Sequence, residues 1–177
     1  MVDWGITDSK KLSDGRATKL ADLIKRAGIP HAIVAIGPEK YNELYTKFKN
    51  LNRLLAWGHA RAIENLLEQV DVDLVIADQF GDKSLIERAL FEKGRKTRLL
   101  QMPRGEQDIA VAAASVMARA EFLNRLDLLG REFGLKLPKG AGAPVDTAAR
   151  QIIKSHGLEV LARLTKTHFK NFTKVQQ

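Results

Sequence analysis

The sequence predicts an α/β fold built around a parallel sheet. Stretches with helical spacing of apolar residues alternate with short apolar runs, and three of these runs read as strands, at 31–37, 73–78 and 97–102. Strands that are separated by helices pair in parallel, which favours the α/β class. Three strands are few for so many helices, so we expect a thin sheet.

Capping residues and apolar spacing place the helices. We predict them at 16–27, from 38 to an interruption at 50–52, from there through 67, at 83–92, at 108–133, at 145–156 and, more briefly, before the aromatic tail. Ser13 and Asp14 are suitable N-terminal caps for the first helix. Gly130 is expected to weaken the long helix, and a loop rich in Gly and Pro covers 137–144.

The composition is that of a globular protein and excludes several classes. The chain has 177 residues, of which 45% are hydrophobic and 28% charged, so we expect one domain with its own core. No apolar run approaches the roughly 20 residues that cross a bilayer, and the first residues lack a signal-peptide core. The absence of cysteine excludes disulfides, thiolate zinc sites and a Cys nucleophile. We therefore expect a cytoplasmic protein with no membrane partner.

Positive charge is concentrated in the C-terminal part of the chain. The formal net charge is +8, and residues 136–177 hold eight Lys and Arg residues against two acidic ones. Such a basic segment favours a polyanionic partner, most often nucleic acid. The alternative is a solvated helix face that serves solubility.

Two acidic residues are candidates for a metal site. Asp78 ends the predicted strand DLVIAD, and ligands of open α/β sheets gather beyond the carboxyl ends of the strands. Glu106 follows the third predicted strand, at the start of an alanine-rich helix whose small side chains allow close packing on a sheet. Two carboxylates that converge there suit a divalent cation such as Mg²⁺. The alternatives are a helix cap for Asp78 and, for Glu106 and its neighbour Asp108, interaction with the helix dipole.

Three further strings have the composition of a nucleic-acid contact. DSKKLSD at 8–14 sets two lysines and two serines beside a predicted helix start, and KGAG at 139–142 offers glycines for a close backbone approach. The tail at 166–174 alternates lysines with His168 and two phenylalanines, which suits stacking on bases or sugars. For each string a structural role is the alternative: solvated surface, an ordinary loop, and packing of the phenylalanines on the core.

Taken in order, these strings resemble ribonuclease HIII, a type 2 ribonuclease H. The resemblance covers essentially the whole chain and rests on DSKKLSD, KYNELYTKFKNLNRLLAWGHARAIENLL, VIADQF, GEQDIAVAAASVMARAEFL, LPKGAGAPVD and KTHFKNF. It implies an RNase H-like fold and endonucleolytic cleavage of the RNA strand in RNA–DNA hybrids. It also implies a requirement for Mg²⁺ or Mn²⁺, which that family holds with four carboxylates.

The resemblance assigns roles to individual residues. Asp78 matches the third carboxylate of the family and Glu106 the fourth, both catalytic and metal-binding, with Asp108 as a competitor for the fourth position. The family's DSKKL string lies near the active site and the substrate backbone. The expected substrate-binding residues are Ser9, Lys10, Lys11, Lys139 and His168.

The sequence departs from the family ahead of DSKKL. Ribonuclease HIII carries its first two carboxylates there as an adjacent Asp-Glu pair in a Gly-rich motif, and neither Asp3 nor any other residue before Asp8 forms it. We therefore expect residues 1–177 to be a single RNase H domain truncated at its N-terminus, with an incomplete fold. A site with only two of the four carboxylates should bind metal poorly, and we therefore expect its activity to be impaired.

Two other functions remain open at this point. The first is a non-catalytic module that holds hybrid or double-stranded RNA, and the second is one part of a split enzyme whose missing strands come from a separate chain. A nucleotide-binding enzyme of another type is disfavoured, because the sequence contains neither GxGxxG nor a P-loop.

Overall fold

The computed structural model describes residues 4–177, so Asp3 lies outside the described part of the chain. The chain divides into two compact units. Of the described residues, the first unit combines 4–35 with 50–123, and the second combines 36–49 with 124–177. The expectation of one truncated RNase H domain over the whole chain stays a prediction.

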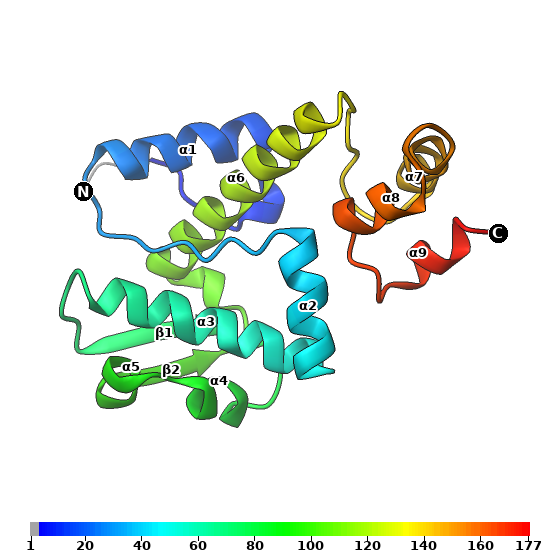
Figure 1. The fold of residues 1–177 in the computed structure, drawn as a ribbon. Helices are drawn as coiled ribbons and strands as arrows, with labels where there is room; N and C mark the ends of the chain where they lie inside the picture. Colours follow the sequence, from blue (N-terminus) through cyan, green and yellow to red (C-terminus); the bar gives the residue numbers. More distant parts are fainter. Residues whose placement is uncertain (1–3) are drawn as a thin grey trace. The chain divides into compact units, whose positions relative to one another are not determined.

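The first unit combines a small sheet with helices (Figure 1). Its elements are η1 (Ser9–Lys11), α1 (Asp14–Arg26), α3 (Leu51–Leu67), β1 (Leu74–Asp78), α4 (Ser84–Ala89), α5 (Glu92–Lys96), β2 (Arg98–Met102), η2 (Gly105–Gln107) and the larger part of α6 (Ile109–Glu132). The side chain of Ser13 accepts a hydrogen bond from the amide of Arg16 and caps α1 as expected. The predicted α/β class is confirmed.

The sheet consists of β1 and β2, which run parallel from the pair Leu74–Arg98 to the pair Asp78–Met102 (Figure 1). The prediction of a third strand at 31–37 is wrong, because this segment forms neither strand nor helix. A strand needs a neighbour with which to exchange backbone hydrogen bonds. Within residues 4–177 the segment has no such neighbour, so its apolar pattern alone does not make it a strand.

Small side chains pack α3 closely against the sheet. Ala56 and Ala60 of α3 form one buried cluster with Ala77 of β1, and Ile86 and Leu90 complete it. Alanines on both facing surfaces let a helix and a strand approach each other. The cluster therefore holds β1 at Ala77, directly before Asp78, the candidate metal ligand.

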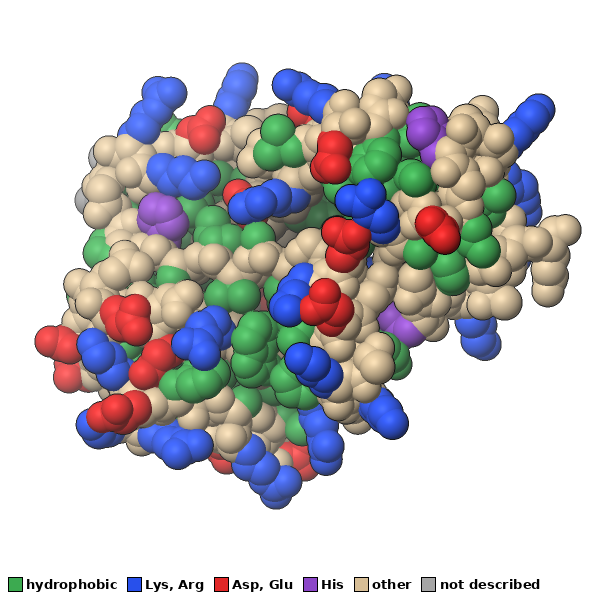
Figure 2. Space-filling model, in the orientation of Figure 1, with side chains coloured by type: hydrophobic (Ala, Val, Ile, Leu, Met, Phe, Trp, Pro, Cys, Tyr) green, Lys and Arg blue, Asp and Glu red, His purple; other side chains and the backbone are tan. Residues whose placement is uncertain are grey.

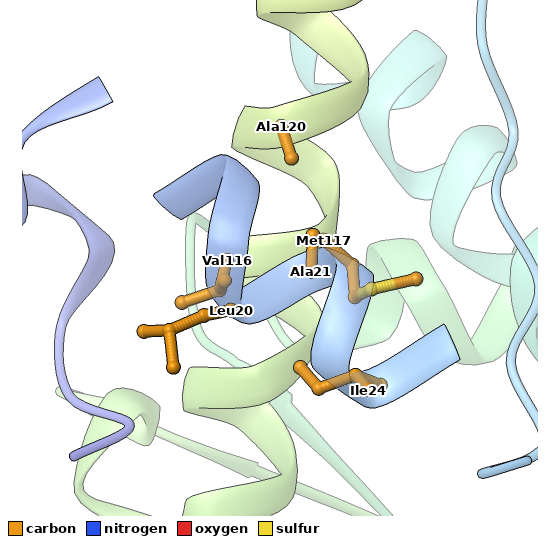
Figure 3. Packing of buried hydrophobic residues seen from close by; sticks show 6 residues of the cluster. All are labelled: Leu20, Ala21, Ile24, Val116, Met117 and Ala120. Carbon is orange, nitrogen blue, oxygen red and sulfur yellow. The ribbon is translucent and has the colours of Figure 1, made fainter. Parts of the chain in front are cut away.

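A second buried cluster joins α1 to α6 (Figure 3). Its members are Leu20, Ala21, Ile24, Val116, Met117 and Ala120. Side chains from the two helices point toward one another, and each is at least about nine-tenths buried. Burial of this apolar surface fixes the segment that contains DSKKLSD next to the alanine-rich helix.

The predicted helix over 83–92 divides into two short helices, α4 and α5. The backbone of Leu90 is extended at the break, with ψ near 139°. The carboxylate of Glu64, from α3, accepts hydrogen bonds from the amides of Lys93 at 3.0 Å and Gly94 at 2.9 Å. A side chain distant in sequence therefore caps α5, and this tertiary contact starts a new helix where local spacing predicted one continuous helix.

The long helix α6 continues through Gly130, contrary to the expected weakness there. It ends at Glu132, and Gly134, two residues later, has a positive φ of 64°. The amide of Leu135 donates to the carbonyl of Gly130 at 2.7 Å, and the amide of Gly134 donates to the carbonyl of Arg131 at 3.1 Å. These two bonds form a Schellman C-cap. Gly130 is required because a Cβ there would lie 2.4 Å from the Leu135 oxygen.

The second unit is helical. It contains α2 (Pro38–Phe48), the end of α6, α7 (Ala143–His156), α8 (Leu158–Leu164) and α9 (Lys170–Lys174). Its buried cluster includes Ile152 of α7 and Leu161 of α8, against which Phe172 packs. Within residues 4–177, no helix is both long and apolar enough to cross a bilayer.

Candidate active site

Asp78 stands at the carboxyl end of β1, and its side chain is exposed. Its Oδ1 accepts a hydrogen bond from the backbone amide of Gly105 at 3.0 Å. A Cβ on Gly105 would lie only 3.0 Å from the Asp78 Cα, so the two backbones are in direct contact. The loop that follows β2 is therefore held against the end of β1, as the sequence predicted for two neighbouring parallel strands.

Glu106 follows Gly105 directly and is half-buried in the short helix η2. Asp108 has a different position: its Oδ1 accepts hydrogen bonds from the amides of Ala110 at 2.9 Å and Val111 at 3.3 Å. Asp108 thus serves as the N-terminal cap of α6. The carboxylate of Glu106 accepts no such bond from the backbone of α6 within residues 4–177.

A histidine that the sequence reasoning did not select also lies near Asp78. The ring of His59, on α3, packs against the ring of Phe80 with centroids 5.0 Å apart. Burial lowers the pKa of His59, while the nearby Asp78 carboxylate acts in the opposite direction. The imidazole is consequently biased toward its neutral form at the site.

The DSKKLSD string is fastened to α6 by its first serine. The buried Ser9 hydroxyl lies 2.7 Å from the hydroxyl of Ser115, and the Arg119 guanidinium donates to the Ser9 carbonyl. The same guanidinium pairs with Asp14 at 2.9 Å. Sequence reasoning missed Ser115 and Arg119 as partners. Their spacing of four, on one face of a helix, was the signal present in the sequence.

The two predicted lysines of this string lie in η1 and are exposed. Asp8 caps η1 by accepting a hydrogen bond from the amide of Lys10 at 2.9 Å. The backbone around Lys10 and Lys11 is therefore fixed while their ammonium groups face solvent. This is the arrangement that a phosphate contact requires, although solvated surface lysines have it too.

The remaining predicted residues, Lys139 and His168, belong to the second unit. Lys139 is exposed in the loop before α7, and His168 lies in a cluster of aromatic rings. Part of the positive charge around them is neutralised, because Arg163 pairs with Glu39 and Lys174 with Asp146. Figure 2 shows Lys and Arg side chains across the viewed face with acidic side chains among them.

The two carboxylates can supply part of a metal site. Within residues 4–177, no group of three or more His, Cys, Asp and Glu residues is arranged to hold an ion. Mg²⁺ is commonly bound by one or two carboxylates together with waters and substrate phosphates. Asp78 and Glu106 fit this partial role and leave most of the coordination sphere to other ligands.

Comparison with known proteins identifies the family. A family model described as Ribonuclease HII matches residues 1–172. The chain therefore belongs to the ribonuclease HII family. It is 45% identical to Ribonuclease HIII of Protochlamydia amoebophila, over 94% of this chain and 55% of that protein. It is 44% identical to Ribonuclease HIII of Chlamydia pneumoniae, over 96% of this chain and 57% of that protein.

Solved structures agree with this assignment. The fold is similar to that of Bst-RNase HIII in complex with Mn²⁺, with a TM-score of 0.89 and 32% identity over 98% of this chain and 58% of that one. Aquifex aeolicus RNase H3 gives a TM-score of 0.65 at 32% identity, over 93% of this chain and 57% of that one. The resemblance to ribonuclease HIII and the RNase H-like fold are thus confirmed. The chain spans little more than half the length of the relatives it matches.

Proposed function

We propose that this chain takes part in the divalent-metal-dependent cleavage of the RNA strand of RNA–DNA hybrids. The observation that supports the proposal is the contact between Asp78 and Gly105, the residue directly before Glu106, at the carboxyl end of the sheet. Membership of the ribonuclease HII family supports the substrate class.

Asp78 and Glu106 are the residues that would hold the metal, either Mg²⁺ or Mn²⁺, and the Mn²⁺ complex of the Bst relative supports a divalent ion. Such ions polarise a phosphodiester and activate water when bound. The Gly105 amide orients the Asp78 carboxylate by donating a hydrogen bond to its Oδ1. Asp108 is proposed to serve the helix rather than the metal, because helix amides already occupy one of its oxygens.

The substrate would be held by its backbone. The ammonium groups of Lys10 and Lys11 are proposed to meet phosphates, with Ser9 fixing their loop on α6. Lys139 and His168 are proposed as further substrate contacts from the second unit. Recognition of a hybrid would then rest on phosphates and 2′-hydroxyls rather than on base edges.

We also propose that cleavage by this chain alone is weak or absent. The family resemblance calls for four carboxylates, whereas the described residues hold no group of three or more candidate ligands. The sheet of two strands gives a second reason, since parallel sheets are normally broader and covered on both faces. Strands that bear the other two carboxylates, supplied by a separate chain, would complete both the sheet and the site. We expect this assembly in the cytoplasm.

The test is cleavage of a labelled RNA–DNA hybrid by the 177-residue chain with Mg²⁺ or Mn²⁺. We expect little turnover by the chain alone and a gain when a segment with the Asp-Glu motif is added. The gain should disappear in Asp78→Asn. Robust turnover by the chain alone that Asp78→Asn abolishes would contradict the proposed impairment, and a lack of any Asp78-dependent cleavage would contradict the proposed activity.

A non-catalytic module that binds hybrid or double-stranded RNA is the second candidate, favoured by the basic charge of residues 136–177. Binding measured in EDTA separates the two functions. Affinity that needs no divalent ion and is unchanged in Asp78→Asn, without cleavage under any condition, would establish the binding module.

A further inference from the structure

Four aromatic rings are in contact in the second unit, three of them stacked and Phe169 tilted against His168, and we call this group the aromatic stack: Tyr41, Tyr45, His168 and Phe169. The centroids of Tyr45 and His168 are 3.9 Å apart, and those of His168 and Phe169 are 4.1 Å apart. Tyr41 adds stacked contacts to Tyr45 at 6.1 Å and to His168 at 5.5 Å. Aromatic pairs of this kind stabilise the segments that carry them beyond the burial of their area.

The inner part of the stack is rigid. Tyr41 is only 4% exposed and comes from α2, one turn before Tyr45. Between them, the side chain of Asn42 donates to the carbonyl of Thr165 at 3.0 Å and accepts from the amide of Thr167 at 3.1 Å. The segment that leads to the outer rings is therefore anchored to α2 by its backbone.

His168 contributes the face of its ring rather than its polar edge. Its buried Nδ1 has no hydrogen-bond partner within the described part of the chain. Burial lowers the pKa of His168, and the charge of Lys166 lowers it further. Its ring stacks on Tyr45 and meets Phe169 at a tilt, so His168 positions Phe169 in addition to its own proposed contact with the substrate.

The two phenylalanines of the tail have different environments. Phe172 packs on the buried cluster of the second unit, as the structural alternative predicted. Phe169 is 45% exposed, although its ring is held by His168. A fixed and accessible aromatic face at the end of a stack is what a nucleobase uses as a platform.

Two lysines flank the aromatic stack, one at Tyr41 and one next to Phe169 in the sequence. Lys166 Nζ lies 4.5 Å from the centre of the Tyr41 ring, and Lys170, next to Phe169, is exposed at the start of α9. We propose that an unpaired nucleobase stacks on Phe169 while Lys166 and Lys170 meet the neighbouring phosphates. The proposal rests on the proposed function, since it adds a contact to single-stranded nucleotides that flank a hybrid.

The experiment measures binding in EDTA, so that no cleavage occurs. A blunt RNA–DNA hybrid is compared with the same hybrid carrying a single-stranded DNA overhang, and with one whose overhang nucleotides lack their bases. We expect the normal overhang to tighten binding by at least about fivefold, because each stacked base contributes that much or more. The abasic overhang should tighten binding only by the amount that its phosphates contribute.

Variants test whether the tighter binding of the overhang depends on the ring of Phe169. Phe169→Ala should lose it and Phe169→Tyr should keep it. Phe122→Ala is the matched control, since Phe122 is 51% exposed on α6 and should keep the full gain. An unchanged thermal midpoint of Phe169→Ala excludes unfolding as the cause. A gain that survives in Phe169→Ala, or an equal gain from the abasic overhang, would overturn the proposal.

A second probe separates this proposal from the proposed function. A thymidine oligonucleotide has no hybrid region, so its affinity reports the platform alone. If the chain binds no hybrid but binds this oligonucleotide in a Phe169-dependent way, the platform stands and the hybrid function fails. If the oligonucleotide binds wild type and Phe169→Ala equally, or binds neither, the platform is refuted.

Discussion

The amide of Gly105 donates a hydrogen bond to Oδ1 of Asp78 at 3.0 Å, across the carboxyl ends of two parallel strands. The bond orients one carboxylate, and the same backbone segment carries the second, on Glu106. The contact leaves no room for a side chain at Gly105. The geometry of the candidate site therefore depends on a residue with no functional group.

Gly105→Ala is expected to displace the loop from Asp78, because the new Cβ would lie 3.0 Å from the Asp78 Cα. Overpacking of this kind costs about 1–3 kcal/mol of unfolding free energy. Urea unfolding measures the loss. Gly58→Ala in α3 is the control: nothing lies within 4 Å of the new Cβ, and a gain of about 0.5–1 kcal/mol is expected in a helix interior. Equal effects of the two substitutions would refute the tight contact.

Substitutions at Glu106 and at Asp108 are expected to affect different properties, metal binding in the first case and stability in the second. Asp108→Ala removes the cap of α6 and should cost about 1 kcal/mol in urea unfolding. Glu106→Gln should leave the unfolding midpoint unchanged and weaken Mn²⁺ binding, followed by calorimetry. The opposite pattern, with Mn²⁺ affinity lost in Asp108→Asn and kept in Glu106→Gln, would assign the metal ligand to Asp108.

Ser115→Ala is expected to destabilise the chain by about 1–3 kcal/mol, because it leaves the buried hydroxyl of Ser9 without its partner. The double variant Ser9→Ala/Ser115→Ala should be less destabilised than the sum of the single variants. Ser155→Ala is the control, since that serine is exposed and its loss should cost under about 0.5 kcal/mol. Additive effects in the double-mutant cycle would refute a direct Ser9–Ser115 bond.

Stability should depend on pH through His168. Its folded-state pKa lies below the ordinary 6.5, so its contribution is complete above that pH and is lost as the pH falls toward the folded value. The groups that face it are Lys166, Tyr41 and Tyr45. His168→Phe keeps the stack without a titrating group, so thermal midpoints should fall less between neutral and mildly acidic pH than in wild type. Parallel pH curves for the two proteins would contradict this.

Local signals in the sequence were sufficient for most helices and for the two carboxylates. Ser13 and Asn50 cap the helices that follow them, because capping is a short-range interaction between a side chain and nearby amides. Asp78 and Glu106 were predictable because each follows an apolar strand run, and parallel strands bring such ends together. Their roles in metal binding remain predictions.

Long-range contacts decided the remaining features. The segment at 31–37 has a strand pattern but no strand beside it, and pattern alone cannot supply backbone partners. The break between α4 and α5 depends on the carboxylate of Glu64, some thirty residues earlier in the chain. Glycine is typical of helix ends, yet α6 continues through Gly130 and its C-cap forms at Gly134.

The sequence by itself determined the family, the α/β class and the positions of the acidic residues, because these follow from residue order and local spacing. The tertiary structure alone decided which residues are free to act. It engaged Asp108 as a cap of α6 and left Glu106 out of that role. It also packed the partly buried Phe172 against a core cluster and left Phe169 exposed. The reason is physical: burial and hydrogen bonding are set by neighbours distant in sequence, so two similar residues a few positions apart can have opposite roles.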